Sequence, residues 1–69
     1  MRYRCFCMTH DDRIITGAFL EANSAYEARA AAEAMWKCVR GFHHVQVWLG
    51  RLLLSSRPSP YQSASHRDV

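Results

Sequence analysis

The sequence predicts a small α+β domain, in which a β-hairpin, one amphipathic helix and one or two further strands form an antiparallel sheet. Strand-like alternation covers residues 2–9 and 14–22, a helix with start and stop signals follows, and alternation returns after residue 43. The 69 residues, 49% of them hydrophobic, suffice for one domain with a thin core. We expect this domain to cover residues 1–54 and a flexible tail rich in Ser and Pro to cover residues 55–69.

The helix is predicted between Ser24 and Gly41. Ser24 is a good N-cap, and Glu27, three residues later, completes a capping box with it. Alanine dominates the segment that follows, and Gly41 suits the left-handed position after a helix. The spacing of three and four residues predicts a buried face made of Ala28, Ala31, Ala32, Met35, Cys38 and Val39.

Two segments before the helix are predicted to pair as an antiparallel hairpin. Residues 2–9 and 14–22 both alternate, and the polar residues 10–13 between them favour a turn. We place a β-bulge at Gly17. The predicted register directs toward the helix Tyr3, Cys5, Cys7, Leu20 and Ala22, and leaves Phe19 and Glu21 on the far side.

The segment after the helix predicts a third strand over residues 45–49. Gly50 and Arg51 suit a tight turn, and residues 52–54 suit a short fourth strand at the edge of the sheet. A connection through the helix brings the third strand beside the first. The first strand is therefore expected to be central.

Several short motifs give the chain a recognisable outline. They are Tyr3-Arg4 at the start of a strand, Glu21-Ala22-Asn23-Ser24 leading into Glu27-Ala28, and the segment 45–51, Val-Gln-Val-Trp-Leu-Gly-Arg. In these motifs, over residues 3 to 54, the chain resembles a set of short uncharacterised proteins of alphaproteobacteria such as the rhizobia. That resemblance implies the fold and a bacterial source, and it implies no activity. Cys5 and Cys7 depart from the pattern, because the group usually carries aliphatic or aromatic residues there.

Composition bears on the setting of the protein. Three cysteines are too few and too unevenly spaced for a disulfide framework, which favours a reducing cytoplasm. We expect no signal peptide and no membrane anchor, because no apolar run approaches the ~20 residues that span a bilayer. The net charge of +3 is mild and does not by itself indicate a nucleic-acid partner.

A metal site is the first chemical possibility that the sequence offers. Cys5, Cys7, Cys38, His43 and His44 include enough soft donors for tetrahedral zinc. Structural zinc usually takes cysteines separated by two to four residues in a turn, whereas Cys5 and Cys7 are one residue apart within a strand. We expect no metal and no cofactor, and we expect these cysteines to pack in the core beside Cys38.

A nucleophile with a neighbouring base is the second chemical possibility. Two pairs could act in this way, Cys38 with His43 and Cys7 with His10, but neither is accompanied by a Gly-rich oxyanion loop or an orienting carboxylate. Asp11 and Asp12 read as solvated turn formers. We therefore expect the protein not to be an enzyme.

The third possibility is the sheet face that the helix leaves uncovered. Large apolar side chains gathered there indicate contact with a partner, since solvated faces are usually polar. Self-association is the favoured interpretation, with Trp48 as its anchor; the alternative is a single-stranded nucleic-acid binder that stacks bases on aromatic residues beside arginines. A third reading is that Trp48 folds over a neighbouring strand and no partner exists. The predicted interface residues are Arg4, Phe6, Met8, Phe19, His44, Gln46 and Trp48.

Overall fold

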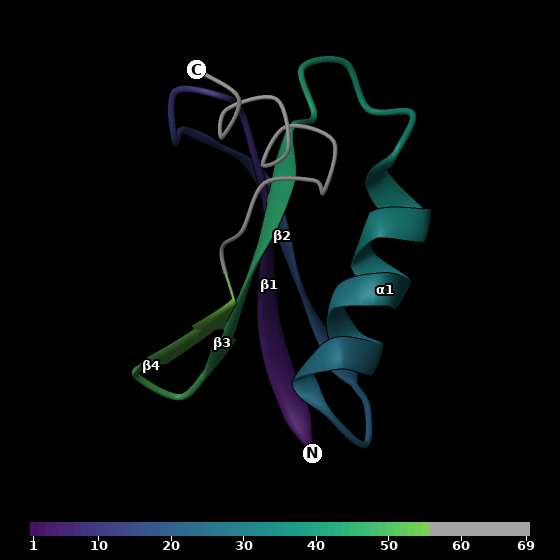
Figure 1. Ribbon diagram of the computed structural model, residues 1–69, viewed down its shortest axis with the longest axis vertical. Coiled ribbons are helices and arrows are strands. Elements are labelled where there is room, and N and C mark those ends of the chain that lie inside the picture. The colour runs from purple at the N-terminus through teal and green to yellow at the C-terminus, as the bar shows by residue number, and fades with distance from the viewer. Residues whose placement is uncertain (56–69) are drawn as a thin grey trace, which may run out of the picture.

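A computed structural model describes residues 1–55 as a four-stranded antiparallel sheet with one helix packed across one of its faces (Figure 1). The elements are β1 (Arg2–Met8), β2 (Ile14–Glu21), α1 (Ala25–Trp36), β3 (His44–Leu49) and β4 (Leu52–Ser55). The strand order is β2-β1-β3-β4, so β1 is internal and β3 lies beside it. The predicted α+β class, the central first strand and the short fourth strand at the edge are all confirmed.

The β1–β2 hairpin has the predicted faces but a different irregularity. Tyr3 pairs with Leu20, and Arg4 pairs with Phe19. The register shifts between the pairs Cys7–Thr16 and Met8–Ile14, which leaves Ile15 as the extra residue on β2. The prediction of a bulge at Gly17 is therefore wrong, because Gly17 stays in register opposite Phe6.

The start of α1 follows the sequence signals. The Ser24 side chain accepts a hydrogen bond of 3.1 Å from the backbone N–H of Glu27. The Glu27 carboxylate accepts a hydrogen bond from the backbone N–H of Asn23, whereas a capping box would have it accept from that of Ser24.

The end of α1 comes earlier than predicted. The helix stops at Trp36, and backbone bonds from Val39 to Trp36 and from Phe42 to Val39 continue the chain as separate turns. Gly41 does adopt the left-handed conformation, with φ of 89°, but it does so in this loop rather than at the helix end. The positive φ that Gly41 permits therefore helps to bring the chain from the loop into β3.

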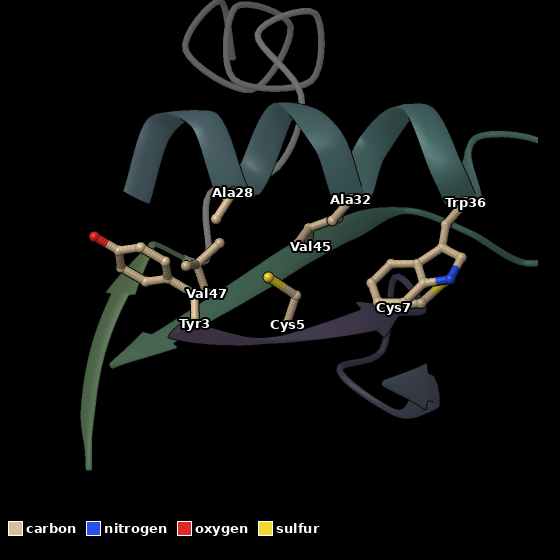
Figure 2. Close-up of a cluster of buried hydrophobic side chains, with 8 residues drawn as sticks. All are labelled: Tyr3, Cys5, Cys7, Ala28, Ala32, Trp36, Val45 and Val47. Carbon is tan, nitrogen blue, oxygen red and sulfur yellow. The ribbon is translucent and has the colours of Figure 1, made fainter. Parts of the chain in front are cut away.

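The core lies between α1 and the sheet, and its helix face differs from the predicted one. Ala28, Ala32 and Trp36 point from α1 toward the strands (Figure 2), whereas Met35 and Cys38 are exposed, as is Ala31. Trp36, rather than Met35 and Cys38, is the large side chain that α1 contributes to the core. Its ring reaches Cys7 at one end of the core (Figure 2). The buried cluster comprises Tyr3, Cys5, Cys7, Ala28, Ala32, Trp36, Val45 and Val47.

Ser55 closes β4, so it belongs to the sheet rather than to the predicted tail. The rest of that tail prediction, residues 56–69, lies outside the described residues. Within residues 1–55, no helix combines the length and the apolar character needed to cross a membrane.

Candidate interaction surface

The sheet face opposite α1, here called the open face, is defined by the strand register. Residues that pair directly across two strands point to the same face of the sheet. The open face consists of the pairs whose side chains point away from the side that holds Val45 and Val47. No helix or strand of residues 1–55 packs over it. Its members are Arg2, Arg4, Phe6, Met8, Ile14, Gly17, Phe19, Glu21, His44, Gln46, Trp48 and Leu53.

One row of this face crosses all four strands. Arg4 on β1 is paired with Phe19 on β2 and with Trp48 on β3, and Trp48 is paired with Leu53 on β4. Phe19 is 59% exposed and Leu53 is 40% exposed, while Trp48 is half-buried. We call these four residues the aromatic row. Phe19, Trp48 and Leu53 place large apolar side chains along this line, and apolar surface of this kind marks contact sites.

The arginines of the open face lie on aromatic rings. The Arg2 guanidinium carbon is 4.8 Å from the centre of the Phe19 ring, and that of Arg4 is 5.4 Å from the centre of the Phe6 ring. A guanidinium held over a ring keeps its N–H groups available for carboxylates or phosphates. The face therefore offers apolar contact and directional positive charge together.

Phe6 lies across Gly17 on the neighbouring strand. A Cβ atom built on Gly17 would be 2.8 Å from Cδ1 of Phe6 and 3.2 Å from the backbone oxygen of Cys5. Glycine therefore allows the ring to settle onto the sheet instead of standing up from it. The Phe6 ring is half-buried as a result and lies over the neighbouring strand, beside the aromatic row.

Trp48 presents its ring without an unpaired polar atom. Its indole N–H donates to the side-chain oxygen of Gln46 at 3.1 Å. This bond satisfies the one donor of the indole and fixes the Gln46 side chain beside the ring. If a partner covered both residues, the indole N–H would keep this hydrogen bond, so its burial would leave no unsatisfied donor.

The structure brings the predicted interface residues onto one face, but it does not expose all of them. Met8 is 3% exposed and His44 is 5% exposed, so neither offers surface to a partner in this conformation. Arg4, Phe6, Phe19, Gln46 and Trp48 remain accessible in part or in full. Arg2 and Leu53 were not among the predicted interface residues. Alternation from Arg4 assigns Arg2 to the face, and pairing across the turn at Gly50 and Arg51 sets Leu53 opposite Trp48.

The cysteines are not gathered into a site. Cys5 and Cys7 have no exposed surface, whereas Cys38 is exposed, so the expectation that all three pack together is wrong for Cys38. Burial raises the pKa of the Cys5 and Cys7 thiols, which disfavours the reactive thiolate. Among residues 1–55, no three or more His, Cys, Asp or Glu side chains are arranged to hold a metal ion.

Comparisons of the chain with protein-family models, with curated proteins and with solved structures give no match. The resemblance to short alphaproteobacterial proteins therefore stays a prediction, and the open face has to be interpreted from its own chemistry.

Proposed function

We propose that this protein is a non-catalytic interaction module that associates with a second copy of itself through the open face. The observation that carries the proposal is the aromatic row. Phe19 and Leu53 leave large apolar surfaces exposed, and Trp48 and Phe6 lie between and beside them. Covering these side chains removes apolar area from water, which stabilises the complex by about 25 cal/mol for each Å² buried.

Two features favour a second copy as the occupant. A core formed by one helix on one sheet is thin, and oligomerisation is a common way for a domain this small to gain stability. The open face also carries both signs of charge, since Arg2 pairs across the strands with Glu21. A two-fold axis that passes between these two residues sets Arg2 of each copy against Glu21 of the other.

The test measures self-association of three variants of the full chain by sedimentation. Trp48→Ala is expected to weaken the dimer at least tenfold, because truncating an aromatic anchor typically costs about 2 kcal/mol or more. Phe19→Ala is expected to weaken it without loss of fold, since Phe19 is 59% exposed. Tyr26→Ala is the matched control, because Tyr26 is an aromatic residue on α1 that is 80% exposed.

Circular dichroism separates an interface effect from a folding effect. The helix signal of each variant should match that of the parent, because α1 packs on the other side of the sheet. A parent chain that stays monomeric at every concentration, or a Tyr26→Ala variant that loses association as strongly as Phe19→Ala, contradicts the proposal.

Single-stranded nucleic acid is the second candidate partner. It is favoured by the position of Arg4 between Phe19 and Trp48, because bases stack on aromatic rings while arginine pairs with phosphate. Binding of this kind weakens steeply with salt, through release of counterions. A monomer that binds an oligonucleotide with strong salt dependence would replace self-association by this second function.

The proposal includes a reducing, cytoplasmic setting. Cys5, Cys7 and Cys38 are all free thiols, and Cys38 is exposed at the surface. An exposed thiol persists where cellular reductants are present.

A further inference from the structure

Three histidines and one carboxylate meet where the β1–β2 turn approaches the loop that precedes β3. The Nδ1 atoms of His43 and His44 are 2.8 Å apart, and the His44 ring is buried. Nε2 of His44 is 3.7 Å from Oδ1 of Asp12, which belongs to the turn. The ring of His10, from the same turn, lies edge-on to His43 with ring centres 6.4 Å apart. We call His43, His44 and Asp12 the histidine junction, and His10 lies at its edge.

Two imidazole nitrogens that face each other at hydrogen-bond distance share one hydrogen. One Nδ1 must carry it and donate, and the other must accept it through a lone pair. The Asp12 carboxylate favours a proton on Nε2 of His44, which leaves Nδ1 of His44 as the acceptor of the neutral pair. If both rings were imidazolium, two N–H groups would point at each other across this contact.

We propose that His43 and His44 are a proton-limited pair, which carries at most one positive charge while the histidine junction is closed, and that a second proton opens the junction. One added proton is tolerated, because an imidazolium on either residue can donate to the neutral ring of the other. The second proton requires the rings to separate. Acidification is therefore coupled to the packing of the β1–β2 turn against the loop before β3.

Most of the surroundings of His44 also disfavour its protonated form. Burial first, and then the neighbouring His43, lower the pKa of His44; Asp12 opposes this effect, and Arg29 on α1 adds to the lowering. Asp12 is 79% exposed by its side chain, so its attraction is screened by water.

Opening of the junction changes the open face. The backbone N–H of His43 donates to the carbonyl of Met8 at 2.8 Å, next to the point where β1 and β3 begin to pair at Met8 and His44. These two residues are the buried members of the open face. Separation of the rings at this point exposes Met8 and a charged His44 at the end of the open face, beyond the aromatic row.

The sign of the pH effect follows from the count of protons. The unfolded chain binds a proton on both histidines below their usual pKa of about 6.5, whereas the closed pair binds one. The unfolded state then holds one more proton than the native state. The closed pair therefore stabilises the native state fully above about pH 6.5, and this stabilisation is lost as the pH falls. Each pH unit of that fall raises the unfolding equilibrium constant by up to about tenfold.

The first test compares urea unfolding of the full chain between about pH 7 and 5. In His44→Asn, the side-chain oxygen can accept from Nδ1 of His43 but does not titrate. We expect the pH dependence of unfolding in the parent to exceed that of His44→Asn by up to about tenfold in the equilibrium constant per pH unit. His10→Asn is the matched control, because His10 contacts His43 only ring to edge, and it should keep the dependence of the parent. Equal dependence in all three chains overturns the proposal.

The second test uses the parent chain alone, at a concentration where it is monomeric, so its outcome is independent of self-association. Nuclear magnetic resonance follows the histidine rings and the hydrogen exchange of the His43 amide as pH falls. We expect the pair to take up protons in two steps, with faster exchange of that amide during the second. Full protonation of both rings with unchanged protection of the His43 amide overturns the proposal.

Discussion

Replacing Gly17 by alanine tests how closely Phe6 is packed on the open face. The new Cβ would lie 2.8 Å from one Phe6 ring carbon and 3.0 Å from the next, distances that require the ring to move. Overpacking of this kind costs about 1–3 kcal/mol. Alanine in place of glycine also reduces the entropy of the unfolded chain, which stabilises the protein by about 0.4–1 kcal/mol. We expect a net loss of about 1–2 kcal/mol from these opposing terms.

A double-mutant cycle isolates the contact between the two residues. In a Phe6→Ala background the new methyl group meets no ring, and the Cys5 carbonyl oxygen at 3.2 Å remains of its three nearest neighbours. Gly17→Ala should then be neutral or stabilising, by up to about 1 kcal/mol, so that the substitution changes sign between the two backgrounds.

Urea unfolding of all four chains, followed by circular dichroism at concentrations where the parent is monomeric, measures this cycle. If Gly17→Ala has the same effect with Phe6 and with Ala at position 6, the ring does not lie across Gly17 and the described geometry of the open face is wrong.

Two further predictions concern the core and the cysteines. Trp36→Ala should cost about 3–5 kcal/mol, which is comparable with the whole stability of a domain this size, so circular dichroism should show a largely unfolded chain. Met35→Ala, at a position that is 49% exposed, should change stability by less than about 0.5 kcal/mol. Similar effects of the two substitutions would contradict the observed helix face. Alkylation under native conditions should label Cys38 alone, because Cys5 and Cys7 are buried and burial raises the pKa of their thiols; mass spectrometry that finds all three labelled at equal rates would contradict their burial.

Local signals in the sequence were sufficient for the class and order of the elements. Ser24 does cap the helix, and alternation placed Tyr3, Cys5 and Cys7 on the helix side of the sheet. Alternation also placed Phe19 and Trp48 on the opposite side. The strand signals work because successive side chains of a regular strand point to opposite faces of the sheet.

The missed features depend on contacts between distant segments. Nothing local separates a helix face through Met35 from one through Trp36, since both fit the spacing; the large indole determines the outcome because it fills the space beside Cys7. The position of the bulge was missed for a similar reason. Glycine at position 17 fits a bulge or a covering ring equally well, and only the placement of Phe6 decides between them.

The burial of Met8 and His44 was also beyond the sequence pattern. Both residues have the parity of the open face, yet Asp12 and the His43 ring approach His44, and the His43 backbone is bonded to Met8. Alternation assigns a face but does not tell whether a neighbouring loop reaches it. The predicted interface residues therefore share one face of the sheet, but two of them are buried.

The most direct test of the central claim is to look for contacts between two copies of the chain. A mixture of isotope-labelled and unlabelled protein, studied by filtered nuclear Overhauser spectroscopy, reports only those protons that lie close to the other copy. We predict intermolecular signals from the rings of Phe6, Phe19 and Trp48, which the structure places together on the open face. Intermolecular signals that come instead from α1, or their complete absence at concentrations well above those of the sedimentation test, would contradict self-association through this face.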